Sequence, residues 1–241
     1  MTEKSPKELT TKQLTGRSES HLVDLPCGNR LQGDVAEAFS ELRGDAARAG
    51  FELVIASGFR SFGRQLEIWN GKASGVRPVH DDVGGEVKMA DLSPRNRLHA
   101  ILRFSALPGT SRHHWGTDMD VFDHAAVEST YSVQLTPGEV APGGVFDPFH
   151  RWLDERIAAG ESHGFHRPYA EDCGGVAPER WHLSYAPIAL SCGGQLTADV
   201  IRACWDSCQG GLLLRAELEE DLPGILGRYV AVPDNWCPAG S

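Results

Sequence analysis

Apolar and polar positions in the first half of the chain alternate between helical and extended patterns. Residues 34–49 carry apolar side chains at every third or fourth position and end before a glycine, which predicts a helix. The β-rich run 51–56 follows, and a second helix is predicted over 62–70. A third helix is predicted over 93–104, because it opens with Ser-Pro, an N-cap followed by proline in the first turn.

The second half of the chain predicts short strands between helices. Residues 118–122 alternate polar and apolar side chains, which indicates a half-buried strand. The remaining predicted elements are a helix over 148–159, strands over 164–167 and 181–185, and two C-terminal helices over 197–208 and 212–221. Together these patterns predict an α+β fold, with a small central antiparallel sheet flanked by helices and with extra C-terminal helices.

The 241 residues suit one domain, and the sequence contains no internal repeat. We expect a polar N-terminal leader over 1–25 and a single domain over 26–241. Residues 71–92 are rich in Gly, Asp and Lys and predict an exposed loop. The final segment, 191–241, is expected to be a helical extension.

Charge and composition exclude several classes of partner. The net charge is −10, which argues against binding to nucleic acid, and no apolar run approaches the roughly 20 residues of a membrane span. Residues 1–25 lack the apolar core of a signal peptide, so a cytoplasmic location with the six cysteines as thiols is expected. Periplasmic or released action stays open if the chain is exported by another route. The oligomeric state is also open.

The ten histidines suggest a metal site, although the helical zinc-protease motif H-E-x-x-H is absent. A catalytic zinc needs about three N or O ligands and one open position for water. His113 and Asp120 can supply two ligands if the chain turns at the glycine between them, and His182 can supply the third. Glu179, three residues before His182, would then stand beside the metal and move a proton between water and the leaving amine.

Two alternatives remain at this site. His114 competes with His113, because a shift of one residue would exchange them. Asp118 shares a strand face with Asp120, so one of the two carboxylates can ligate while the other orients a neighbour or a substrate amine. The other histidines are interpreted as surface or core residues; among them are His80, His99, His124, His150 and His163.

Four motifs occur in one order along the chain. They are S-G-F-R-S at 57–61 with Gln65 after it, S-x-H-x-x-G-x-D-x-D at 111–120, G-F-H-R at 164–167 and E-R-W-H at 179–182. This series resembles the D-Ala-D-Ala metallopeptidases, the carboxypeptidases and dipeptidases of vancomycin-resistance type. They belong to the LAS group with lysostaphin-type peptidases and hedgehog signalling domains. The resemblance covers about 50–190 and implies a hedgehog/D,D-peptidase-like fold.

The resemblance also implies roles for individual residues. It makes His113, Asp120 and His182 ligands of Zn²⁺, Glu179 the general base, and Arg60 the group that binds substrate and stabilises the oxyanion. The residues expected at the substrate are Ser111, Gln65 and Asp118. Two positions depart from the family pattern, since Asp118 stands where many members have a small residue and Arg180 replaces a frequent proline. Either departure could alter specificity.

The sequence therefore predicts a zinc-dependent hydrolase of D-alanyl-D-alanine carboxypeptidase or dipeptidase type. Its expected substrate is a peptidoglycan peptide, a precursor or a D-amino-acid dipeptide. Two alternatives are a lysin-like endopeptidase that cuts peptidoglycan polymer, and a zinc-binding module without turnover, as in hedgehog-type domains of the same group. The presence of both Glu179 and Arg60 argues against the module, because binding alone requires no general base.

Overall fold

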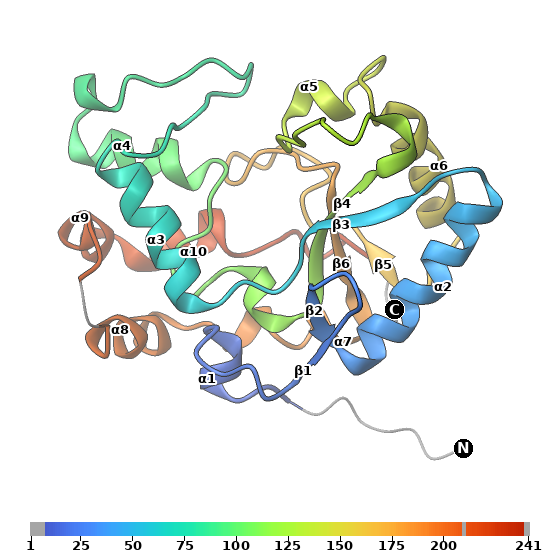
Figure 1. Cartoon of the computed structure of the whole chain (residues 1–241). Coiled ribbons are helices and arrows are strands. Elements are labelled where there is room, and N and C mark those ends of the chain that lie inside the picture. Colours follow the sequence, from blue (N-terminus) through green and yellow to red (C-terminus); the bar gives the residue numbers. More distant parts are fainter. Residues whose placement is uncertain (1–7, 209–210, 239–241) are drawn as a thin grey trace.

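A four-stranded antiparallel sheet occupies the middle of the molecule (Figure 1). The computed structural model describes residues 8–208 and 211–238. The strands of this sheet, in their spatial order, are β3 (Leu53–Ser57), β4 (Asp118–Asp123), β6 (His182–Tyr185) and β5 (Phe165–His166). A separate hairpin pairs β1 (Leu22–Asp24) with β2 (Arg30–Gln32). The predicted α+β class with a small antiparallel sheet is confirmed.

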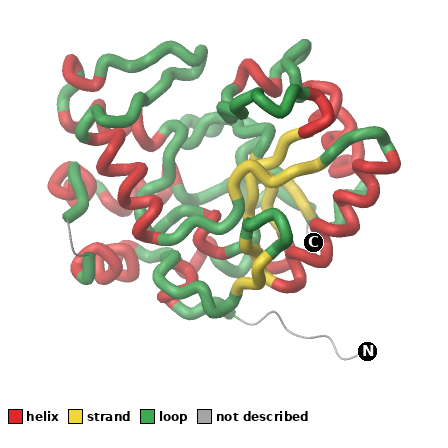
Figure 2. Tube along the Cα trace, in the orientation of Figure 1, coloured by secondary structure: helices red, strands yellow, loops and turns green. Residues whose placement is uncertain are grey.

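Helices surround the strands, which gather at the centre of the molecule (Figure 2). In the view of Figure 1, α2 and α6 lie on one side of the sheet, and α3, α4 and the C-terminal helices lie on the other. The helices are α1 (Thr11–Leu14), α2 (Gly33–Arg48), α3 (Phe62–Ala73), α4 (Pro94–Leu102), α5 (Pro137–Val140), α6 (Asp147–Ala158), α7 (Ala186–Ala189), α8 (Ala198–Asp206), α9 (Arg215–Glu220) and α10 (Leu222–Tyr229).

Capping residues explain where several of the predicted helices begin. Ser61 and Ser93 accept hydrogen bonds from backbone amides in the first turns of α3 and α4, as N-caps do. Toward the C-terminus the sequence predicted two helices, and the described residues from 197 to 208 and from 211 to 238 form three, α8, α9 and α10. The extra helix, α10, begins after Asp221, whose carboxylate accepts a hydrogen bond from the Gly224 amide at 3.1 Å. Asp221, the last residue of the predicted helix 212–221, is therefore the N-cap of α10.

The expectation of a half-buried strand over 118–122 is wrong, because every residue of β4 is buried. β4 lies in the interior of the sheet between β3 and β6, and side chains on both of its faces are covered. Its polar positions are therefore not solvent-facing. They are buried carboxylates, which require partners in the protein interior.

One apolar core joins the ends of the chain to its centre. Leu14 of α1 and Leu218 of α9 belong to the same buried cluster as Leu183 of β6. The Phe62 amide donates to the Gly16 carbonyl at 2.8 Å, so the described part of the predicted leader packs onto α3. Trp205 of α8 donates through its indole to the Pro108 carbonyl at 2.9 Å. No helix within residues 8–208 and 211–238 combines the length and apolar character needed to cross a membrane.

Candidate active site

The register of the sheet brings Asp120 and His182 together. Asp120 on β4 pairs directly with His182 on β6, and on its other side it pairs with Ser57 of β3. Side chains that face one another across antiparallel strands have Cβ atoms about 5 Å apart. The Asp120 Oδ1 lies 3.2 Å from the His182 Nδ1. Strand pairing alone therefore joins a carboxylate and an imidazole that are far apart in sequence.

A tight turn before β4 adds His113. Residues Arg112–Trp115 form one 3₁₀ turn that ends at Gly116, in the left-handed conformation (φ 69°) that glycine adopts without strain. The turn reverses the chain, so the His113 Nε2 lies 3.4 Å from the Asp120 Oδ2. The Arg60 amide donates to the His113 carbonyl at 3.1 Å and fixes the turn against the segment after β3.

Glu179 reaches the same place from the loop before β6. The His182 amide donates to the Glu179 carbonyl at 3.0 Å, and this turn places the Glu179 Oε2 3.6 Å from the His182 Nδ1. Arg180 secures the loop by pairing with Asp154 and Asp147 of α6, at 2.6 and 2.8 Å. Arg180, which replaces a proline frequent in the family, thus points away from the site and fixes the loop that carries Glu179.

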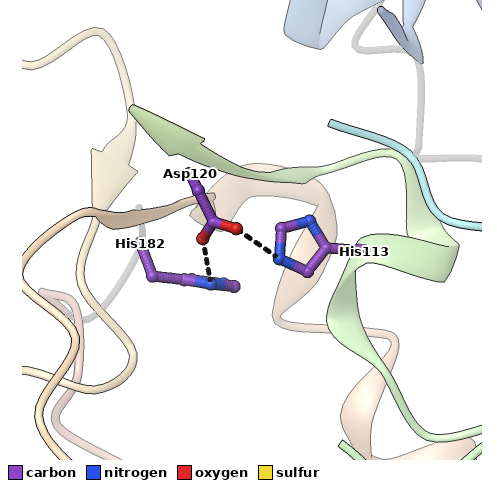
Figure 3. Close-up of side chains that lie close together, drawn as sticks. All are labelled: His113, Asp120 and His182. Atoms are coloured by element: carbon purple, nitrogen blue, oxygen red, sulfur yellow. Dashed lines mark ion pairs between the residues drawn. The ribbon is translucent and has the colours of Figure 1, made fainter. Parts of the chain in front are cut away.

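His113, Asp120 and His182 form a buried cluster (Figure 3). The Asp120 carboxylate points between the two imidazoles and faces one with each oxygen. One ligand atom from each residue lies within 4.8 Å of the others. The three groups are a site that can hold a metal ion.

Both imidazoles are oriented as metal-binding histidines are. The second nitrogen of each ring faces an oxygen: the His113 Nδ1 lies 2.9 Å from the Gly58 carbonyl, and the His182 Nε2 lies 3.0 Å from the Asp118 Oδ1. Such contacts fix the tautomer and leave the other nitrogen free to ligate. Two imidazoles and one carboxylate form a donor set that suits zinc, with a position left for water. The residues therefore fit a catalytic metal.

Asp118 is held on the far side of the His182 ring from Asp120. Its carboxylate accepts hydrogen bonds from the Arg112 Nε at 2.7 Å and from the Thr117 hydroxyl at 2.5 Å. Asp118 and Arg112 are both buried, so their charges compensate one another in the interior. The sequence left two roles open for Asp118, to orient a neighbouring group or to contact substrate, and its position beside the His182 Nε2 fits the first.

Burial and neighbouring charges shift the pKa values in this cluster. Burial raises the pKa of Glu179 to about 7, with Asp120 adding to the rise and His182 opposing it. Burial lowers the pKa of His113. Burial also lowers the pKa of His182, but hydrogen bonds to Asp118 and Asp120 outweigh it and raise that pKa to about 9. A carboxyl group with a pKa near neutrality can both accept and return a proton.

A pocket of about 340 Å³ opens onto the cluster. Its lining includes His113, Asp120, His182 and Glu179 together with Arg60 and Ser111. Arg60 is held in place by its own neighbours, since its guanidinium donates to the Gln65 Oε1 at 2.9 Å and to the Ser57 Oγ at 3.1 Å. The pocket therefore presents a fixed cation beside the candidate metal ligands.

Other predicted residues occupy different positions. The His114 ring faces the Arg60 carbonyl at 2.6 Å and accepts from the Gly109 amide at 3.2 Å, so His113 and not His114 joins the cluster. Gln65, expected to line the substrate pocket, is fully buried and uses its amide to bridge Arg60 and the Ala106 carbonyl.

The pocket is also lined by residues that no sequence motif identified as part of the site. Lys72 of α3 and Tyr229 of α10 line it, as does His80, which was interpreted as a surface or core residue. The loop 71–92 supplies part of the pocket wall. Arg103 forms ion pairs with Asp82 of this loop and with Asp172 of a second loop, each at 2.7 Å, and so joins the two loops. Lys72 follows Gln65 by seven residues, about two helical turns, so both lie on the same face of α3. This spacing is the sequence signal that could have placed Lys72 near the pocket.

A known protein family matches the part of the sequence that contains this site. The VanY family, described as D-alanyl-D-alanine carboxypeptidase, matches residues 28–188, which is more than half of the chain. The chain belongs to the VanY family. The match includes every residue of the candidate metal cluster and Glu179, and the family is one of carboxypeptidases.

Individual proteins are also similar to this chain. An uncharacterized protein of Haemophilus influenzae is 45% identical over 104 residues, which cover 42% of this chain and 71% of that protein. A D-alanyl-D-alanine carboxypeptidase of Enterococcus faecalis is 29% identical over 171 residues, which cover 69% of this chain and 52% of that enzyme. The solved structure of VanYB in complex with D-alanine-D-alanine has a TM-score of 0.50 at 23% identity, covering 82% of this chain and 87% of that one, and shares the fold.

Proposed function

We propose that this VanY-family chain is a zinc-dependent D-alanyl-D-alanine carboxypeptidase that acts on peptidoglycan peptides or their precursors. The observation that carries the proposal is the meeting of His113, Asp120 and His182 within 4.8 Å, with Glu179 beside them in the same pocket. A zinc ion held by these three groups would polarise the scissile carbonyl and make bound water more acidic.

The chain's own residues supply the rest of the chemistry. Glu179 takes a proton from the attacking water and delivers it to the nitrogen of the leaving D-amino acid. The Arg60 guanidinium offsets the negative charge that develops on the carbonyl oxygen. Ser57 and Gln65 hold that guanidinium in one orientation, so little reorganisation accompanies the reaction. The Ser111 side chain is a hydrogen-bonding group for the bound peptide on the pocket wall.

The decisive experiment compares wild type with Glu179→Gln, with zinc content and hydrolysis measured on the same preparations. We expect both proteins to bind about one zinc ion. We expect the variant to hydrolyse a stem pentapeptide ending in D-Ala-D-Ala at least about 10²-fold more slowly, because general acid–base catalysis contributes factors of this order. Glu171→Gln, a change at an exposed glutamate, is the matched control and should keep full activity.

The same preparations separate the alternatives. A chelator should abolish wild-type hydrolysis, and added zinc should restore it. Mass spectrometry of the products from D-Ala-D-Ala, from the pentapeptide and from whole sacculi identifies the bond that is cut. Cleavage of sacculi alone would replace the proposal with an endopeptidase. Bound zinc without hydrolysis of any of the three would make the chain a binding module.

A further inference from the structure

Lys72 is a cation inside the pocket that the proposed chemistry does not use. It lies on α3, seven residues after Gln65, so the two side chains leave the helix on nearly the same face. Seven residues of helix span about 10 Å along its axis. Gln65 contacts Arg60, and Lys72 lines the same pocket as Arg60, so Lys72 adds a second cation to the pocket wall.

Lys72 is hydrogen-bonded to a neutral group. Its Nζ donates to the Ser105 Oγ at 2.5 Å, and among the residues that the structure describes no carboxylate forms an ion pair with it. A buried cation is normally paired, because removing a charge from water is costly. A half-buried lysine whose one hydrogen bond is to a neutral hydroxyl keeps donors available for a ligand.

The surrounding charges favour an anionic ligand at this point. The positive charges of Arg60 and Arg77 lower the pKa of Lys72, and the negative charge of Glu179 raises it. Asp81, also on the pocket wall, directs its carboxylate to the Val83 and Gly85 amides of its own loop. Burial, with Arg60 adding to it, lowers the pKa of Lys72 to about 8. A ligand carboxylate beside Lys72 would relieve this destabilisation of its charged form.

A substrate of a carboxypeptidase brings such a carboxylate with it. The residue that leaves carries the free chain end, one residue beyond the scissile carbonyl. Arg60 and Lys72 line the same pocket, so a substrate whose carbonyl oxygen lies at Arg60 has a second cation, Lys72, available to its terminal carboxylate. We propose, on the basis of the function proposed above, that Lys72 binds the C-terminal carboxylate of the substrate and so makes the site select chain ends over internal peptide bonds.

The test compares two peptides that differ only at the chain end. One ends in D-Ala-D-Ala with a free carboxylate, and the other is its C-terminal amide. Zinc-loaded wild type should prefer the acid. Lys72→Met, which keeps the apolar stem and removes the charge, should raise KM for the acid by about 10- to 100-fold, the range of one charge-assisted hydrogen bond. It should leave kcat nearly unchanged, because the contact is made equally in the ground and transition states.

Three comparisons make the result specific. The amide substrate should be cleaved equally well by wild type and Lys72→Met. Lys72→Arg, which restores a cation, should recover most of the preference for the acid. Lys88→Met, at an exposed lysine outside the pocket lining, should behave as wild type. A loss that is equal for acid and amide would mean that Lys72 only supports the structure, and an unchanged KM for the acid would also overturn the proposal.

A binding measurement separates this inference from the function on which it rests. The zinc-loaded Glu179→Gln protein is titrated calorimetrically with the acid and the amide, with Lys72 present and with Lys72→Met. Weaker binding of the acid alone in the Lys72→Met background supports the inference, even if wild type hydrolyses neither peptide and the proposed function fails. Equal binding of acid and amide by the protein that retains Lys72 overturns the inference, even if wild type is an active carboxypeptidase.

Discussion

At the scale of single residues, both histidines and the arginine of the site are fixed by a partner behind them. Gly58 and Asp118 orient the two histidines, and Gln65 orients Arg60. Behind Asp118 stands Arg112, which also donates to the Ser184 Oγ at 2.6 Å. Asp118 therefore contacts the candidate metal site from behind, through His182.

Asp118→Asn tests this positioning role. The change removes the negative charge that makes the His182 ring more basic and leaves Arg112 buried beside a neutral amide. Losing such an outer contact typically weakens metal binding by 10- to 100-fold, and we expect a loss in this range. Competition with a chromophoric chelator measures the zinc affinity directly. Glu179→Gln is the control with wild-type affinity, and equal affinities of Asp118→Asn and wild type would contradict the role.

At the scale of elements, the site depends on how one turn meets one strand. The 3₁₀ turn Arg112–Trp115 and β4 carry His113 and Asp120, and Gly116 is the joint between them. A Cβ atom built on Gly116 would lie 2.3 Å from the Leu22 Cδ2 of the small hairpin. The joint thus favours glycine for its positive φ, and the Leu22 side chain would have to shift to admit a Cβ atom.

Gly116→Ala should destabilise the protein by roughly 1–3 kcal/mol, from the left-handed backbone and the contact with Leu22. Chemical denaturation, followed by circular dichroism, measures this change in the free energy of unfolding. Gly63→Ala is the matched control, because Gly63 lies within α3 with open space around it, and alanine there should be neutral or stabilising. A Gly116→Ala protein as stable as wild type would show that the turn does not require glycine.

At the scale of the whole molecule, the C-terminal helices are part of the core that supports the site. Trp205 of α8 is buried and binds the Pro108 carbonyl, within the loop that leads to Ser111. Tyr229 of α10 lines the pocket, and its hydroxyl lies 3.0 Å from the His99 Nδ1. The extension therefore helps to build the pocket wall.

Trp205→Ala should cost roughly 3–5 kcal/mol, the usual effect of removing a buried tryptophan. Because one core contains both the extension and the sheet, we expect loss of helix signal and release of zinc to occur in a single denaturation transition. Leu190→Ala, at a side chain that is 46% exposed, is the control and should change stability by less than about 0.5 kcal/mol. A separate early transition that leaves zinc bound would show instead that the extension unfolds independently.

The sequence by itself determined what local chemistry controls. Helical spacing and caps predicted α2, α3, α4 and α6, because periodicity and capping depend on residues within a few positions of one another. Two of the four motifs, at 111–120 and 179–182, also identified His113, Asp120, His182 and Glu179 as candidates, and the structure brings these four residues together.

The tertiary structure decided what depends on contacts between distant segments. Strand order made β4 an interior strand and turned its polar positions into buried partners, which no alternation within six residues can reveal. It also selected His113 over His114, placed Asp118 behind His182, and brought Lys72 and Tyr229 to one pocket. The physical reason is that a side chain's partners are set by strand register and core packing, which join residues tens of positions apart in the sequence.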